Sequence, residues 1–394
     1  MTHWSVPYMV LTTIMLILMI VIFPGFLFLL GYAFYLEWVD RKFYADQQHR
    51  IGPFHTGWRG ILQPFADFVK LLAKEDITPV AADKIGFTLT PILALAIPLT
   101  TLLLVPIFGP WVYMYTTPGT VLPVSGVLFF EGDLLMIGFF STMFSMILFI
   151  AGWSSSNRFG FTGAVRGVIQ MLAFEIPMLL GLFAAGMVAG SLSLTNVVLY
   201  QANLGLPLIF HPAFFGLFII FIFAGQAEAE RLPFDAPIAE TEIVGGWETE
   251  FSGKKLAFFR LSNNLELLLI SGLATATFLG GPLGPEIFLI FINNGFWTPV
   301  TFYSGEYVTF IAATMPYLLN PFIGAIYYTF WFIVKTTIVV LILSNLKGLL
   351  ARWRIDQIAH LSWKWAIPAS LLMVALILVW PWIMNWFLAL PFIP

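Results

Sequence analysis

The sequence contains no cysteine and only a small share of charged residues. Because none of its 394 residues is Cys, disulfide bonds, thiolate-bound iron–sulfur clusters and Cys-based zinc sites are excluded. The five His residues lack the spacing of a metal site, and no GxGxxG or Walker sequence precedes an expected helix. We therefore expect no catalytic residue, no metal ligand and no nucleic-acid partner. Any redox or nucleotide chemistry is expected in partner proteins.

Charged residues make up 10% of the chain and hydrophobic residues 59%. Soluble domains carry about 25% charged residues, so this composition predicts an integral membrane protein. Nearly the whole length is needed for membrane spans and short connections. The sequence therefore predicts a single polytopic membrane domain over residues 1–394.

Eight segments are long and apolar enough to cross a bilayer, which takes about 20 residues. They predict an all-α fold with a long, tilted first helix. The first span lacks a basic leading region and a small-residue cleavage site, so we expect it to remain as an anchor. The interrupted apolar stretch 283–318 is expected at the outer interface. The predicted spans are 8–36, 86–108, 132–153, 164–189, 213–229, 256–280, 321–346 and 366–388.

The basic residues predict the orientation. Of the 18 Lys and Arg residues, 17 lie in or beside the odd-numbered connections, and only Lys335 lies deep in a span. Basic residues accumulate in cytoplasmic loops. We therefore expect large cytoplasmic loops 1 and 5, with both termini outside.

The fifth connection is unusually acidic. Residues 228–250 hold seven of the chain's 21 carboxylates. Charge near hydrocarbon costs roughly 2.5–3.5 kcal/mol or more, so such a density beside a span predicts a functional segment. The alternative is a solvated charged turn. The prolines in Pro233–Asp235 and at Pro237 make the backbone rigid, and apolar and polar side chains are mixed there. Both features favour docking to another protein.

Three ionisable residues are expected near the middle of spans: Glu175, Glu266 and Lys335. They could be paired structural residues facing other helices. Because burial raises the pKa of a carboxyl and lowers that of a lysine, they could also relay protons. We favour the relay for Glu175 and Lys335.

Two further loops carry patterns typical of the membrane surface. Apolar residues between 61 and 72 recur with helical period, which predicts a helix on the headgroups or at the rim of the bundle. Basic and aromatic residues at 350–357 are equally suited to lipid headgroups and to a partner.

Five groups of residues, in order along the chain, resemble one family. They are Arg50–Pro53 with Leu62–Leu72; Ala151–Asn157; Arg166–Gln170 with Phe174 and Glu175; the acidic segment from Ala227 to Gly253; and Arg352–Gln357. Together they resemble the membrane subunit at the peripheral-arm junction of respiratory complex I, often called its H subunit.

The resemblance implies a bundle that is covered by two peripheral subunits and forms the cavity for a lipid-soluble quinone. It implies iron–sulfur clusters in those peripheral partners. It also implies small membrane subunits and antiporter-like subunits beside this chain in the bilayer. The implied location is the plasma membrane of a bacterium or archaeon.

The resemblance also implies roles for individual residues, which fall into a proton path and a set of contacts to the quinone cavity and the peripheral arm. By motif, Glu37, Glu175, Glu228 and Glu240 match acids of a proton path. With the remaining candidates, the expected proton path is Glu37, Glu175, Glu228, Glu230, Glu240, Glu242, Glu266 and Lys335. The expected contacts to the quinone cavity and the peripheral arm are Arg41, Arg50, Asp67, Arg231, Phe234, Asp235, Glu248 and Glu250.

The chain departs from the family's usual pattern at three places. The pattern has Glu where this loop has Ile238, and Asn where it has Glu230. The family's acid in span six falls on Asn263, and Glu266 follows three residues later. These departures leave the family assignment unchanged but leave open which electron acceptor the complex uses.

The sequence thus predicts a subunit, without a redox centre of its own, of a proton- or sodium-pumping oxidoreductase with quinone as acceptor. One alternative is the equivalent subunit of a ferredoxin-dependent hydrogenase or sulfur-reducing complex that needs no quinone. A stand-alone ion antiporter and a purely structural anchor are the others.

Overall fold

The computed structural model describes residues 17–18, 20–107, 126–128, 130–285 and 321–389. This part of the chain folds entirely into helices and loops, without a β-strand, so the expected all-α membrane fold is confirmed. Eight of its helices correspond, in order, to the eight predicted spans. They are α2 (Phe26–Gln47), α4 (Lys84–Leu102), α6 (Asp133–Ser154), α7 (Arg158–Ala189), α9 (Pro212–Glu228), α11 (Gly253–Phe278), α14 (Pro321–Leu349) and α16 (Ile367–Ala389).

Among the described residues, five helices are long and apolar enough to cross a membrane. They are α4, α6, α7, α14 and the continuous helix that α15 (Ile355–Leu361) and α16 form together, with a π-turn between them. Helix α9 is apolar but shorter. Besides α2 and α11, the remaining α-helices are α3 (Gln63–Ala73), which lies in the expected amphipathic region, α8 (Leu194–Leu204) and α10 (Glu240–Ile243).

Helix ends follow from local side chains. The Asn157 side chain accepts a hydrogen bond from the Phe159 amide at 2.9 Å and so caps the start of α7. Gly190, with a φ of +68°, ends the same helix in the left-handed conformation that glycine adopts without steric cost. At α4, the Asp83 carboxylate performs the same capping role toward the Ile85 amide.

The first predicted span differs from the structure in its bounds. The helix is interrupted at 22–25, and α2 then runs to Gln47, eleven residues beyond the predicted end at 36. Pro24 has no amide hydrogen, and Gly25 has the highest entropy cost in a helix, so the break falls there. The predicted interfacial stretch 283–318 lies outside the described residues from 286 on.

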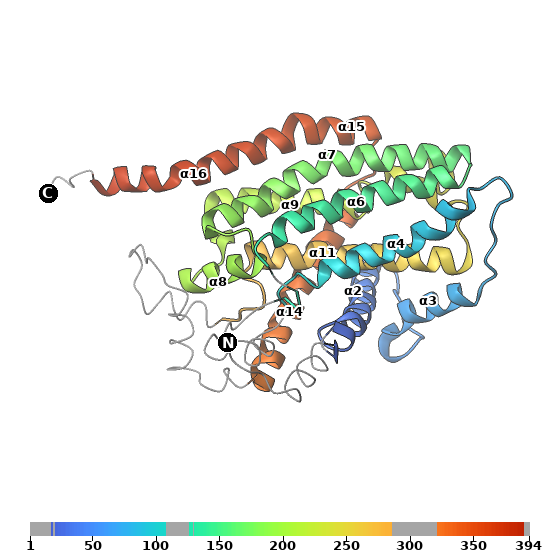
Figure 1. Ribbon diagram of the computed structural model, residues 1–394, viewed down its shortest axis with the longest axis horizontal. Helices are drawn as coiled ribbons and strands as arrows, with labels where there is room; N and C mark the ends of the chain where they lie inside the picture. Colours follow the sequence, from blue (N-terminus) through green and yellow to red (C-terminus); the bar gives the residue numbers. More distant parts are fainter. Residues whose placement is uncertain (1–16, 19, 108–125, 129, 286–320, 390–394) are drawn as a thin grey trace, which may run out of the picture.

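The bundle is organised around two central helices. Helix α7 packs against α6, α9 and α16, whereas α11 packs against α2, α3, α4 and α14. Figure 1 shows α6, α7 and α9 side by side, with α2 and α14 crossing the bundle obliquely. The largest core cluster takes Phe221, Leu268 and Phe332 from three of these helices.

The odd-numbered connections meet at one end of the bundle. The Trp353 amide donates to the Pro233 carbonyl at 3.1 Å, Arg166 pairs with Glu242 at 2.5 Å, and Lys255 pairs with Asp76 at 3.1 Å. In Figure 1, α3 and α15 lie at this end, while α8 and the last turns of α16 lie at the other. The basic loops are therefore gathered together, beside the acidic loop.

Candidate functional site

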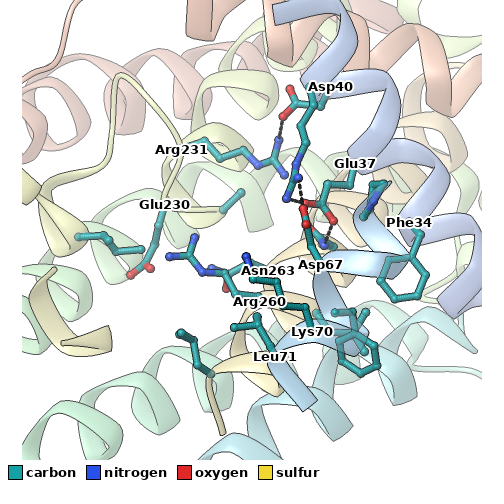
Figure 2. A pocket seen from close by; sticks show the side chains of 18 of the residues that line it. Phe34, Glu37, Asp40, Asp67, Lys70, Leu71, Glu230, Arg231, Arg260 and Asn263 are labelled. Carbon is teal, nitrogen blue, oxygen red and sulfur yellow. Dashed lines mark hydrogen bonds and ion pairs between the residues drawn. The ribbon is translucent and has the colours of Figure 1, made fainter. Parts of the chain in front are cut away.

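A cavity, which we call the main cavity, lies between α2, α3, α11 and the acidic loop. Its volume is about 580 Å³. Apolar side chains such as Phe34, Phe68 and Leu71 form part of its wall, and charged side chains form most of the rest (Figure 2). The charged lining residues are Glu37, Asp40, Arg41, Asp67, Lys70, Lys74, Glu230, Arg231, Arg260 and Lys347.

A first network joins α2, α3 and α11 across the cavity. The carboxylate of Glu37 accepts from Arg41 on one oxygen and from Asn264 on the other. Arg41 also donates to Asp67 at 2.7 Å, and Asp67 accepts from Gln63 at 3.0 Å. The amphipathic helix α3 is thus tied to the bundle by polar contacts inside the cavity.

A second network surrounds Asp40, which is 3% exposed. One carboxylate oxygen pairs with Arg231 at 2.7 Å and with Lys347 at 3.3 Å. The other oxygen is buried without a hydrogen-bond partner in the described structure. Two cations therefore converge on one acid, where α2, α14 and the acidic loop meet.

A third group, the Glu230 cluster, consists of Glu230, Trp247, Glu248 and Arg260. The Trp247 indole donates to both Glu230 oxygens, at 3.1 and 3.3 Å, and Arg260 pairs with Glu248 at 2.6 Å. Burial raises the pKa of Glu230 to about 8. Burial also raises the pKa of Glu248, against the opposing effect of Arg260.

Two glutamine side chains hold the acidic loop in place through hydrogen bonds to its backbone carbonyls. The Gln170 side chain donates to the carbonyls of Ala227 and Phe234 at 2.6 and 2.7 Å, and Gln226 donates to that of Leu232 at 2.6 Å. These bonds satisfy buried carbonyls that the turn leaves unpaired. At Gly246, with φ at +57°, a Cβ would lie 1.8 Å from the Pro237 carbonyl, so no other residue fits.

Three buried acids lie inside the bundle, beyond the cavity. On α6, Ser141 donates to Glu228 of α9, and the next residue, Thr142, lies 2.5 Å from a Glu175 oxygen. Glu228 interacts electrostatically with both Glu175 and Glu266. These three predicted proton-path residues therefore form one buried group, which includes Glu266 of α11.

Lys335 lies elsewhere, although the sequence groups it with the buried acids. Its ammonium donates to the carbonyls of Leu279, Gly281 and Leu283 at 2.6, 3.1 and 2.5 Å, just after α11 ends. A cation is favoured at a helix C-terminus. Lys335 thus hydrogen-bonds to backbone carbonyl oxygens at the end of α11.

The other residues expected from the acidic loop lie outside the cavity lining. Phe234 is fully buried between Phe174 and Trp353. Asp235 pairs with Arg352 at 3.0 Å, and burial raises the pKa of this carboxyl.

Three loop glutamates lie toward the surface. Glu240 is exposed, and Glu250 accepts from Asn157 at 2.5 Å. The hydrogen bond from Arg166 lowers the pKa of Glu242. None of the three lines the main cavity.

Arg50 lies at a second cavity of about 390 Å³. Arg41 and Lys347 line both cavities, so their side chains separate the two spaces. Tyr44 also lines the second cavity, and Lys347 lies over its ring at 4.6 Å.

Sequence reasoning missed Asp40, Arg260, Asn264 and Lys347 as members of the site. One signal was present, because Glu37, Asp40 and Arg41 have the i, i+3, i+4 spacing of a single helical face. Arg260 and Lys347 gave no such signal, since they reach the cavity from helices distant in sequence. Among the described residues, no group of three or more His, Asp or Glu side chains could hold a metal ion.

Comparison with known proteins gives consistent matches over most of the chain. The profile of a family described as NADH dehydrogenase matches residues 7–378. The H subunit 1 of NADH-quinone oxidoreductase from Solibacter usitatus is 33% identical over 361 residues, which cover 86% of this chain and 90% of the relative. The H subunit 2 from Geobacter sulfurreducens is 33% identical over 350 residues, with 88% and 91% covered. The H subunit from Thermomicrobium roseum is 32% identical over 359 residues, with 88% and 91% covered.

Proposed function

The chain belongs to the NADH dehydrogenase family, as a relative of the H subunit of complex I, and from this premise we propose that it couples quinone reduction to ion translocation. It supplies no redox centre. Instead, it forms the membrane wall of a quinone cavity. The change in charge that accompanies quinone reduction is transmitted through it to buried acids.

The observation that carries this proposal is the main cavity, with its mixed apolar and paired polar lining. Its 580 Å³ falls within the roughly 300–1,000 Å³ of small-molecule sites, which combine apolar walls with a few placed polar groups. Phe34, Phe68 and Leu71 suit an isoprenoid quinone's apolar parts. Arg41 and Asn264 offer hydrogen-bond donors to its carbonyl oxygens.

The buried acids support the coupling part of the proposal. Glu37 stands at the cavity, bonded to Asn264 of α11, and Glu266 lies two residues farther along the same helix. Glu266 interacts with Glu228, which interacts with Glu175. Intramembrane acids mark ion pathways, and this series extends from the cavity toward the centre of the bundle.

The exposed polar residues of the acidic loop and Arg50 fit contact with peripheral subunits that carry iron–sulfur clusters. The exposed apolar faces of α16 and α6 fit neighbouring membrane subunits. We propose the plasma membrane of a bacterium or archaeon as the location. The test described next distinguishes quinone from another acceptor, such as that of hydrogenase-type complexes.

Leu71 and Val69 of α3 provide a matched test of the cavity. Leu71 lines the cavity, whereas Val69 is 45% exposed on the opposite side of the helix. In the purified complex, a photoreactive quinone should label peptides of α2, α3 and α11, and excess quinone should suppress the labelling. Leu71→Trp should reduce the labelling and raise the KM for quinone about tenfold, while Val69→Trp should leave both unchanged.

Labelling confined to other subunits, together with an unchanged KM in Leu71→Trp, would refute a quinone site at this cavity. A wild-type complex that evolves hydrogen or reduces sulfur without reducing quinone would favour the hydrogenase-type alternative.

A further inference from the structure

The Glu230 cluster combines two carboxyls with a single cation. Glu230 is 7% exposed and is held by the indole of Trp247, which is fully buried. Glu248 is also buried; one of its oxygens pairs with Arg260, and the other has no hydrogen-bond partner in the described structure. A buried acceptor without a partner is destabilising, because it has lost its hydrogen bonds to water. The cluster is therefore one donor short when both carboxyls are ionised.

Arg260 pairs with one carboxyl and interacts electrostatically with the other. Its side chain is 57% exposed and lines the cavity, so it is not fixed by packing. Figure 2 shows its guanidinium extending into the cavity on the side of Glu230. Arg260 interacts electrostatically with Glu230 and hydrogen-bonds to Glu248. Both carboxyls therefore lie within the electrostatic range of this one cation.

Glu230 lies beside the other position at which the acidic loop departs from the family pattern. A Cβ added to Gly167 would lie 3.3 Å from a Glu230 oxygen and 3.5 Å from the Pro237 Cβ. Ile238 follows directly and lines the same cavity. The wall therefore has its acid at position 230 and an apolar side chain at position 238.

We propose that Glu230 is the proton-exchanging acid of the cavity wall, and that Arg260 moves between Glu248 and Glu230 according to which of them is ionised. Neutral Glu230 leaves Arg260 on Glu248. When Glu230 releases its proton to water in the cavity, the resulting carboxylate is stabilised by the Trp247 indole and attracts Arg260. Reprotonation reverses both changes. The inference deepens the proposed function and rests on it, because the cavity's ligand would respond to this charge.

Most of the other charged groups around the cavity have ion-pair partners. Glu37 and Asp67 pair with Arg41, and Asp40 pairs with Arg231 and Lys347 through one of its two oxygens. Lys70 and Lys74 of α3 also line the cavity. Glu248 opposes ionisation of Glu230, and Arg260 favours it. Burial holds Glu230 in its neutral form up to about pH 8, which puts the exchange near physiological pH.

Infrared spectroscopy of the purified complex, titrated from about pH 6 to about 9.5, tests the proposal directly. A protonated carboxyl has a C=O stretching band that disappears on ionisation. The wild type should lose such absorbance near pH 8, and Glu230→Gln should lack the share of this change that comes from one carboxyl. Glu131→Gln, an acid-to-amide change at the other end of the bundle, should retain it. An unaltered titration in Glu230→Gln would overturn the assignment.

The neighbours give opposite shifts that a purely structural role would not produce. Arg260→Gln removes the cation that favours ionisation, and Trp247→Phe removes the indole donor, so both should move the loss of the band to higher pH. Glu248→Gln removes the opposing charge and frees Arg260, so it should move the loss to lower pH. Shifts in the same direction for Arg260→Gln and Glu248→Gln would overturn the sharing of Arg260.

A relocation variant tests the role of position. In the double variant Glu230→Gln, Ile238→Glu, a carboxyl returns to the same wall, and a titrating band should reappear. Should Glu230→Gln fail to assemble, Glu230→Asp keeps a shorter carboxyl; its band should titrate at a shifted pH, and a wild-type titration in that variant would overturn the proposal. Failure of the quinone proposal would appear separately, as an absence of quinone-dependent turnover in a wild-type complex whose band still titrates.

Discussion

At the scale of single residues, Thr142 stands between two acceptors. Its hydroxyl oxygen lies 2.9 Å from the Gly138 carbonyl and 2.5 Å from a Glu175 oxygen, yet a hydroxyl has only one hydrogen to donate. When Glu175 is ionised, Thr142 can donate to it. When Glu175 is protonated, Glu175 can donate to Thr142, which then donates to Gly138. The hydroxyl can therefore partner both charge states of the acid.

This geometry predicts that Thr142→Val, which keeps the shape and removes the hydroxyl, impairs ion pumping. A hydrogen bond to a charged group contributes about 1.5–3 kcal/mol, so pumping at a given electron flux should fall about tenfold or more. Thr142→Ser should keep most of it. Proton uptake by proteoliposomes containing the assembled complex measures the effect. Thr100→Val is the control, since Thr100 is exposed and bonds carbonyls of its own helix; an equal loss in both valine variants would contradict the prediction.

Glu230 predicts a pH dependence of stability. Its pKa is about 8 in the folded chain against an ordinary 4.5, so the folded state keeps a proton that the unfolded state has lost between these values. Stability contributed by this group is therefore fully present below pH 4.5 and is lost as the pH rises to 8. Glu230→Gln does not titrate.

Melting temperatures of the detergent-purified complex, measured at several pH values across that window, check this expectation. The melting temperature of Glu230→Gln should rise relative to wild type as the pH increases. The exposed acid Glu131 provides the control, because Glu131→Gln should follow the wild type. A constant difference between Glu230→Gln and the wild type would contradict the raised pKa.

At the scale of elements, Lys335 links two helices. Its ammonium holds three carbonyls that follow the end of α11, and Lys335 itself belongs to α14. Gly281, one of these partners, has a φ of +58°, and a Cβ there would lie 2.9 Å from Val198. The turn thus needs glycine to bring its carbonyls toward the ammonium.

Lys335→Met is therefore expected to destabilise the packing of α11 against α14. Each carbonyl left buried without a donor costs about 1–3 kcal/mol, so the melting temperature should fall clearly. Lys254→Met, which removes an exposed lysine at the other end of α11, should have little effect. If Lys335→Met instead abolished pumping without any change in melting temperature, Lys335 would belong to the proton path that its sequence position suggests.

The elements were largely predictable from the sequence, and their partners were not. Apolar runs predicted α6 and α7 within a few residues at most ends, because burial of a 20-residue helix depends on local composition. Helix α8 was missed, since its amphipathic eleven residues are too short for a span. The carbonyl partners of Lys335 carry no sequence signal at all, because every residue has the same backbone oxygen.

At the scale of the whole molecule, the site depends on contacts between distant segments. Glu37 and Asn264 are 227 residues apart, and Arg231 and Asp40 are 191 apart. A motif can identify the acids of the fifth loop, but only the fold shows that Arg260 and Lys347 line the same cavity. The separation of the predicted acids into a cavity group and a buried group is likewise a property of the packing.

That separation leads to a prediction about the entire path. If Glu37 at the cavity and Glu175 in the buried group belong to one coupled series, removing both should cost less than the sum of the single losses. In a double-mutant cycle of Glu37→Gln and Glu175→Gln, we expect a coupling free energy of about 1 kcal/mol or more, measured as pumping rate at fixed electron flux. Glu131→Gln combined with Glu175→Gln should be additive within about 0.5 kcal/mol, since Glu131 lies outside both groups. Additive losses in the first cycle would mean that the two acids act independently, and α11, which bonds Glu37 through Asn264 and carries Glu266, would then connect them in space without transmitting any change in charge.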